Sequence, residues 1–127
     1  MRELLDELLI LAKAASKRAY APYSGYHVGS AVMTAERKVY TGCNVENASY
    51  SLTICAERNA VFKAISEGYQ DIIAIAIYVD SDRLFPPCGA CRQVLAEFNP
   101  KMEIVYANQN EAIYNTLDIL LPGAFSL

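Results

Sequence analysis

The feature that most constrains the fold is an almost uninterrupted apolar run, "DIIAIAIYV", at positions 71–79. The run is rich in β-branched residues and short for a helix, so it predicts a strand. A strand that is apolar on both sides must be covered on both faces of its sheet, as a central strand between two layers of helices is. The run therefore predicts a sheet flanked by helices.

The rest of the chain supplies elements for both layers. Apolar residues at helical spacing predict a first helix over residues 2–19 and another over 55–67, with Gly68 as the C-terminal cap of the second. The other runs predict a hairpin at 27–35 and 39–45, a helix through 94–98, a strand at 102–108, an edge strand at 111–115 and a final helical turn. This order predicts an α/β fold, a three-layer α/β/α sandwich with a mixed five-stranded sheet, in which helix-linked strands of the second half run parallel.

Length and charge limit the class of protein. The chain has 127 residues without a linker or a repeat, which predicts a single domain over residues 1–127. Its net charge is -3 and it has no basic cluster, so a nucleic-acid partner is not expected and a small neutral ligand is favoured. The N-terminus is typical of an amphipathic helix rather than a signal peptide, and no apolar run reaches the length of a membrane span. We therefore expect a cytoplasmic protein with no membrane partner.

Four cysteines, at positions 43, 55, 88 and 91, carry the strongest chemical signal. In a reducing compartment they are expected to be thiols or metal ligands rather than disulfides. The Cys88-x-x-Cys91 pair alone leaves redox and structural roles open. A thioredoxin-like pair, however, follows the first strand of a βαβ unit, whereas Cys88 follows a proline-rich loop.

The upstream Cys55 changes this reading, because it supplies a third thiolate. A catalytic zinc ion takes three protein ligands and leaves a fourth position for water, while a structural zinc ion takes four protein ligands. The spare thiol of Cys43 and the only histidine, His27, have no spacing that ties them to the other three. The sequence therefore predicts one zinc ion per subunit on Cys55, Cys88 and Cys91, with an open position.

Two charged residues follow Cys55 in the first turn of the predicted helix. Glu57 can lean over the open side of the metal, where a carboxylate can take a proton from water and return it elsewhere. The alternative is an acid that only complements the helix dipole. Arg58 can donate to the thiolates and, with the two helix N-termini, offset the net charge of -1 of a zinc ion with three thiolates. The alternative for Arg58 is a solvated surface residue.

The segments "CAER" and "PCGACRQVL" resemble the signature of the zinc-dependent cytidine deaminases in their small three-cysteine form. In the variant that begins His-x-Glu, a histidine stands at the position of Cys55. The segments "YAPYSGYHVGSAV", "GCNVENASY" and "LLPGAF" are similar to segments of the same family in the same order, so the resemblance runs from Tyr20 to Phe125. It implies the cytidine deaminase-like fold and hydrolytic deamination of cytidine and deoxycytidine to uridine and deoxyuridine in pyrimidine salvage.

The resemblance also implies roles for single residues. Cys55, Cys88 and Cys91 match the zinc ligands, and Glu57 matches the proton shuttle. The positions it assigns to the substrate are Asn44 and Glu46, which hydrogen-bond the ribose hydroxyls, Val45 between them, the backbone of Ala56 at the pyrimidine, and Tyr26, a ring-packing position that is commonly Phe. Phe125 matches an aromatic that reaches a neighbouring subunit's site, which implies a homotetramer with sites completed across subunit interfaces.

Several alternatives stay open from the sequence. Blasticidin-S-type and free-base deaminases share "CAE" and "PCGxCRQ", although "NVENASY" argues for ribose recognition. A zinc-stabilised scaffold would need four protein ligands and would tolerate any residue in place of Glu57. Asn44 and Glu46 can instead cap the loop that follows them. Tyr50 is a further candidate for the pocket wall, while Cys43 is expected to be a small buried hydrophobe and His27 a structural histidine.

Overall fold

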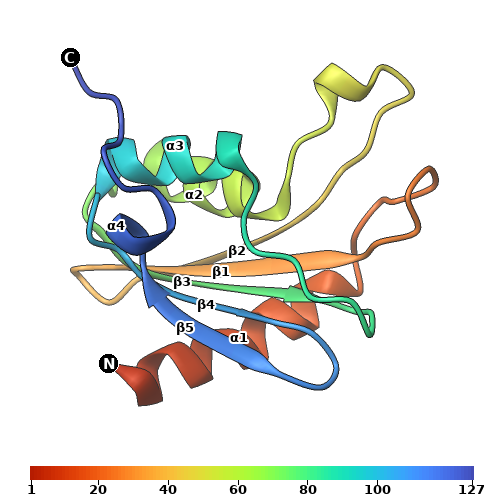
Figure 1. The fold of residues 1–127 in the computed structure, drawn as a ribbon, viewed down its shortest axis with the longest axis horizontal. Helices are drawn as coiled ribbons and strands as arrows, with labels where there is room; N and C mark the ends of the chain where they lie inside the picture. The colour runs from red at the N-terminus through yellow and green to blue at the C-terminus, as the bar shows by residue number, and fades with distance from the viewer.

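The computed structural model describes residues 1–127 and shows a five-stranded sheet with helices on both faces (Figure 1). The elements are α1 (Arg2–Ser16), β1 (Val28–Thr34), β2 (Val39–Cys43), a 3-10 turn (Tyr50–Leu52), α2 (Ala56–Ser66), β3 (Ile72–Val79), α3 (Gly89–Phe98), β4 (Glu103–Ala107), β5 (Ala112–Thr116) and α4 (Leu117–Leu120). The predicted order is confirmed. No helix of the chain combines the length and the apolar character that crossing a bilayer would require.

Two details differ from the sequence-based expectation. The first helix ends at Ser16 rather than at residue 19, because the next backbone N–H groups bond three residues back, Lys17 to Ala14 and Arg18 to Ala15. The hydroxyl of Ser16 also bonds the carbonyl oxygen of Lys13. This tighter bonding is typical of the last turn of a helix. The segment between β2 and α2, for which no element is predicted above, contains the 3-10 turn.

The sheet has the strand order β2-β1-β3-β4-β5. Strand β1 pairs antiparallel with both β2 and β3, and β5 pairs antiparallel with β4. Strands β3 and β4, which α3 connects, run parallel. The predictions of a hairpin, a central β3, a parallel pair in the second half and a short edge strand at the end are thus confirmed.

The two faces of the sheet carry separate hydrophobic cores, and Figure 1 shows α1 on one face and α2 and α3 on the other. Strand β3 serves both cores because its side chains alternate. Ile75 and Ile77 pack in the core that includes residues of α2, α3 and α4, while Ala74 and Ala76 pack in the core that includes α1. Burial on both faces is what the continuous apolar run required, so the layered fold is confirmed.

Gly42 of β2 determines how closely α2 approaches the sheet. A Cβ atom at this position would lie 2.5 Å from the backbone nitrogen of Ala60 and 2.7 Å from the backbone oxygen of Ala56. Both atoms belong to the backbone of α2, so neither can move without the helix. The glycine therefore fixes the depth at which the first turn of α2, with the residues that follow Cys55, rests against the sheet.

We expect the Gly42→Ala variant to unfold about 1–3 kcal/mol more easily than the wild type, because the added methyl group overpacks the contact between β2 and α2. Urea unfolding followed by circular dichroism measures the difference. Gly89→Ala is the matched control, since a Cβ atom there meets no atom within 4 Å. Equal destabilisation by both substitutions would contradict the role given to the close contact.

Candidate active site

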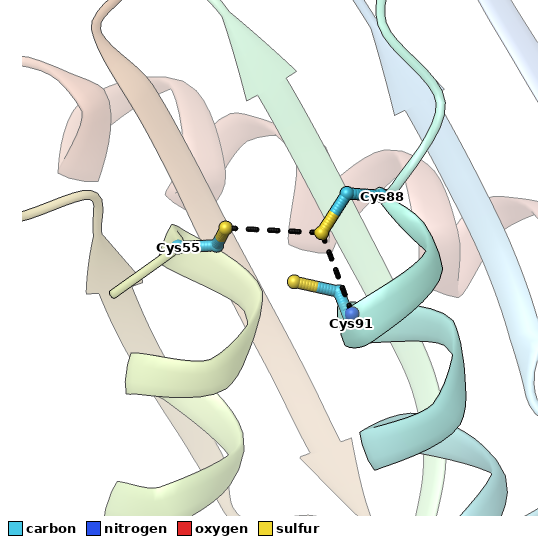
Figure 2. A group of neighbouring side chains, drawn as sticks. All are labelled: Cys55, Cys88 and Cys91. Atoms are coloured by element: carbon cyan, nitrogen blue, oxygen red, sulfur yellow. Dashed lines mark hydrogen bonds between the residues drawn. The ribbon is translucent and has the colours of Figure 1, made fainter. Parts of the chain in front are cut away.

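The first turns of α2 and α3 bring three thiols together (Figure 2). Cys55 and Cys88 are the N-cap residues of these two helices, and Cys91 lies in the first turn of α3. The three sulfur atoms lie within 4.8 Å of one another, and those of Cys55 and Cys88 are 4.0 Å apart. In a tetrahedral zinc site with Zn–S bonds of about 2.3 Å, the sulfur atoms would be about 3.8 Å apart. The cluster thus has the ligand type and almost the spacing that zinc requires.

The surroundings of the cluster stabilise negative charge on sulfur. Nη2 of Arg58 donates to Sγ of Cys55 at 3.5 Å, and the backbone N–H of Cys91 donates to Sγ of Cys88 at 3.4 Å. Hydrogen bonds from Cys91 and Arg58 lower the pKa of the Cys55 thiol to about 5. The shared hydrogen bond with Cys55, together with burial, raises the pKa of Cys91. Thiolate, the form that binds metal, is therefore favoured at Cys55.

The position of Arg58 also indicates that the three cysteines carry negative charge, as thiolate ligands of a metal cation do. Its Nε atom is buried and has no hydrogen-bond partner, although the guanidinium group lies beside the thiols. A solvated surface arginine would not have a buried Nε, so that alternative is wrong. All four cysteines of the chain are free, and Cys91 is fully buried while Cys88 is exposed. The donor set of three sulfurs fits a zinc ion with one remaining position.

Glu57 lies on the inner side of α2 and is only 5% exposed. Its side chain lines the same cavity as Cys55 and Cys88. Burial raises the pKa of its carboxyl group to about 7, and the charge of Cys55 contributes in the same direction. An acid that served only the helix dipole would be solvated, whereas this carboxyl is held inside the cavity beside the thiols.

The cavity has a volume of about 320 Å³, which lies in the range of small-molecule sites. Of the residues predicted from the sequence, seven line it: Tyr26, Asn44, Glu46, Cys55, Ala56, Glu57 and Cys88. Val45 does not line it, because its side chain points away from its two neighbours and is 47% exposed. Phe125 is also outside and is 72% exposed near the C-terminus. The chain alone therefore assembles the metal cluster, the acid and most of the predicted substrate-binding residues.

Asn44, just after β2, is buried and is held at both ends of its amide. Its Oδ1 accepts the backbone N–H of Val28 at 2.9 Å, and its Nδ2 donates to the carbonyl oxygen of Tyr26 at 2.8 Å. Both partners lie in the segment before β1 or at its start, not in the loop that follows Asn44. The amide keeps one N–H and one lone pair for a ligand in the cavity.

Glu46 is held by the turn before β1. Its Oε1 accepts the backbone N–H groups of Tyr23 at 2.9 Å and Ser24 at 3.1 Å, and its Oε2 accepts the hydroxyl of Ser24 at 2.5 Å. The hydrogen bond from the Ser24 hydroxyl lowers the pKa of the Glu46 carboxyl, so the group is an acceptor at neutral pH. The alternative that Asn44 and Glu46 cap the following loop is wrong, since none of these partners lies there.

The structure adds wall residues that the sequence reasoning missed. They are Val28, Thr53, Ile77, Val79, Phe85 and Pro86. Ile77 and Val79 are two residues apart on β3, so they face the same side of the sheet. The alternation of a strand could therefore have predicted both of them. Phe85 packs edge-on against Tyr26 with ring centroids 4.8 Å apart. The signal for Phe85 was weaker, an aromatic residue three positions before a predicted ligand.

Three secondary candidates lie elsewhere. Tyr50 is 77% exposed and packs against Tyr23 rather than in the cavity. His27 is not part of the thiol cluster, and its carbonyl oxygen accepts the backbone N–H of Asp80. Cys43 is only partly buried, not a fully buried hydrophobe, because it lies at the end of the edge strand β2.

Comparisons with known proteins agree with this geometry. Residues 2–108 match the family model of the cytidine and deoxycytidylate deaminase zinc-binding region. The chain is 48% identical over 126 residues to the cytidine deaminase of Halalkalibacterium halodurans, covering 96% of each chain. It superposes on the crystal structure of cytidine deaminase from Burkholderia pseudomallei with a TM-score of 0.89 and 47% identity, covering 94% of this chain and 98% of that one. A more distant relative, the blasticidin-S deaminase of Bacillus cereus, is 28% identical over 105 residues, covering 76% of this chain and 75% of that one.

Proposed function

Because this chain belongs to the cytidine and deoxycytidylate deaminase family, we propose that it catalyses the hydrolytic deamination of cytidine and deoxycytidine to uridine and deoxyuridine, with release of ammonia. The observation that carries the proposal is the buried Glu57, which lines one cavity with Cys55 and Cys88, two of the three clustered thiols. A carboxyl group removed from water next to a metal-binding cluster is the arrangement that hydrolysis of this kind requires.

Cys55, Cys88 and Cys91 would hold the zinc ion, and Arg58 would donate to their thiolates. When bound, zinc supplies a Lewis acid that lowers the pKa of water. Glu57 takes a proton from the water molecule that attacks C4 of the pyrimidine. It returns a proton to N3 and transfers another to the departing amino group, so that one water molecule is consumed and one ammonia molecule leaves.

The residues of the cavity wall are suited to the two parts of a nucleoside, the pyrimidine ring and the sugar. Tyr26 and Phe85 form an aromatic edge for the pyrimidine ring, and the backbone of Ala56 faces it. Asn44 and Glu46 carry unused hydrogen-bonding capacity for the sugar hydroxyls. A site built to bond these hydroxyls discriminates against ligands that lack them, since its polar groups would stay unpaired.

A blasticidin-S-type activity is the second candidate, supported by the more distant relative with that name. The greater identity to cytidine deaminases favours the nucleoside reaction. A free base would leave Asn44 and Glu46 without a ligand. A zinc-stabilised scaffold is disfavoured because Cys43 and His27 lie outside the three-thiol cluster, so no fourth protein ligand is at hand.

We further propose that residues 1–127 act as one catalytic domain in a homotetramer. Phe125 and Ile119 of the C-terminal segment are both exposed, which supports an interface in which Phe125 enters the site of a neighbouring subunit. Val45 is exposed beside Asn44. In this proposal it contacts substrate only after assembly of the tetramer has changed the shape of the cavity next to Asn44. A cytoplasmic location is supported by the four free thiols, which a reducing compartment preserves.

The proposal is tested by comparing four substrates. We expect ammonia release and loss of ultraviolet absorbance with cytidine and deoxycytidine, and turnover at least about a hundredfold slower with cytosine, because a site with unpaired polar groups loses several kcal/mol of binding. Blasticidin S is the fourth substrate. Zinc content of about one ion per chain is measured on the same sample. Faster turnover of blasticidin S or cytosine than of cytidine would replace the proposed substrate class.

A further inference from the structure

A serine outside the cavity connects the side chains that face the sugar. Ser24 lies in the exposed turn before β1 and does not line the cavity. Its hydroxyl donates to Oε2 of Glu46 at 2.5 Å and accepts the backbone N–H of Tyr26 at 3.0 Å. The carbonyl oxygen of Tyr26 in turn accepts Nδ2 of Asn44 at 2.8 Å. A chain of hydrogen bonds thus runs from Asn44 through the backbone of Tyr26 and the hydroxyl of Ser24 to Glu46.

The number of acceptor sites on Glu46 shows that the Ser24 hydroxyl controls the orientation of the one site left free for a ligand. A carboxylate offers about four lone-pair sites. Two sites on Oε1 accept backbone N–H groups, and one on Oε2 accepts the Ser24 hydroxyl. The remaining site is therefore on Oε2, the oxygen that Ser24 holds. Without this hydroxyl the carboxylate is anchored only through Oε1, and the direction of its free lone pair is no longer fixed.

We propose that Ser24 is a positioning residue for sugar recognition, which orients the carboxyl group of Glu46 without touching the substrate. This inference rests on the proposed function and extends it to a residue outside the cavity. The effect of Ser24 falls on binding through the sugar hydroxyls and not on the chemistry at Glu57, because the one cavity side chain that its hydroxyl bonds is that of Glu46, while at Tyr26 it bonds only the backbone N–H. A serine that only stabilised its turn would act on all substrates alike.

The test compares the wild type with Ser24→Ala on cytidine and on 2′,3′-dideoxycytidine, which lacks the 2′- and 3′-hydroxyls of the sugar and keeps the 5′-hydroxyl. With cytidine we expect KM to rise about five- to thirtyfold, less than the full loss of a hydrogen bond to a charged group would give, because Glu46 stays anchored through Oε1, and kcat to change less than about threefold. With dideoxycytidine we expect KM to change less than about twofold. Ser24→Thr keeps the hydroxyl at an exposed position and should restore the KM of the wild type for cytidine.

Two controls make the comparison specific. Ser66→Ala removes another exposed serine hydroxyl, one that bonds Lys63 at the end of α2, and should leave both KM values unchanged. Combined with Glu46→Gln, the Ser24→Ala substitution should add almost nothing, since the two groups act as a pair. An unchanged KM for cytidine, or an equal rise for both substrates, would overturn the inference.

The same ligands separate this inference from the proposed function. A wild type that binds cytidine but releases no ammonia would refute the proposed activity alone. Dissociation constants from calorimetry would then report the role of Ser24, with the same expected rise for cytidine and none for dideoxycytidine. Equal dissociation constants for the wild type and Ser24→Ala would refute that role whether or not turnover is seen.

Discussion

The Glu57→Gln variant is expected to keep its zinc and its fold and to lose about 10²- to 10⁴-fold in kcat, the usual contribution of a general acid–base group. Glutamine has nearly the same shape as glutamate but cannot accept and return a proton. The only other carboxyl group that lines the cavity, that of Glu46, is held by Tyr23 and Ser24, so it does not replace that of Glu57. Steady-state ammonia release measures kcat, and metal analysis of the same sample measures zinc.

Glu67→Gln is the matched control, because Glu67 is an exposed acid at the other end of α2. It should leave kcat and zinc content unchanged. A Glu57→Gln variant that deaminates cytidine at a nearly normal rate would remove Glu57 from the mechanism. Loss of zinc in that variant would instead show that the carboxyl group supports the metal cluster.

The second large effect is expected for Cys88→Ala. The side chain is exposed, so its removal leaves no cavity in the core, and loss of function can be assigned to the lost ligand. We expect zinc content to fall from about one ion per chain to nearly none. Activity should fall by at least about 10³-fold, because a bound metal contributes several kcal/mol to this class of hydrolysis. Metal analysis and ammonia release check the two values.

Cys43→Ala is the control for Cys88→Ala. Cys43 is the one cysteine outside the cluster, so its substitution should leave zinc and activity at wild-type levels. Chelation of the wild type should reproduce the loss of activity, and added zinc should reverse it. Zinc retained by Cys88→Ala, or lost equally by both variants, would contradict the three-ligand assignment.

Much of the fold was predictable because it depends on local pattern. The run at residues 71–79 required cover on both faces, and β3 lies in the middle of the sheet with a core on each side. Helix ends were less predictable, since the last turn of α1 closes through short-range bonds that periodicity does not report. The depth of α2 was not predictable either, because it depends on the contact of Gly42 with a helix more than ten residues further along the chain.

The active site, like the fold, was predictable only in part. The spacing of Cys55, Glu57 and the Cys88-x-x-Cys91 pair predicted which residues meet, and the structure brings the three thiols together beside the acid. Phe85 and the hydrogen bonds of Ser24 were not predicted, since each depends on which segments become neighbours after folding.

The sequence by itself determined the order of the elements, the identity of the metal-binding thiols and the acid beside them. These follow from periodicity and from short spacings within single segments, where backbone geometry leaves few choices. Only the tertiary structure decided how Glu46 is oriented, which aromatic ring faces Tyr26 and how closely α2 lies against the sheet. The physical reason is that these contacts join segments distant in the sequence, and their distances are set by the packing of the whole core.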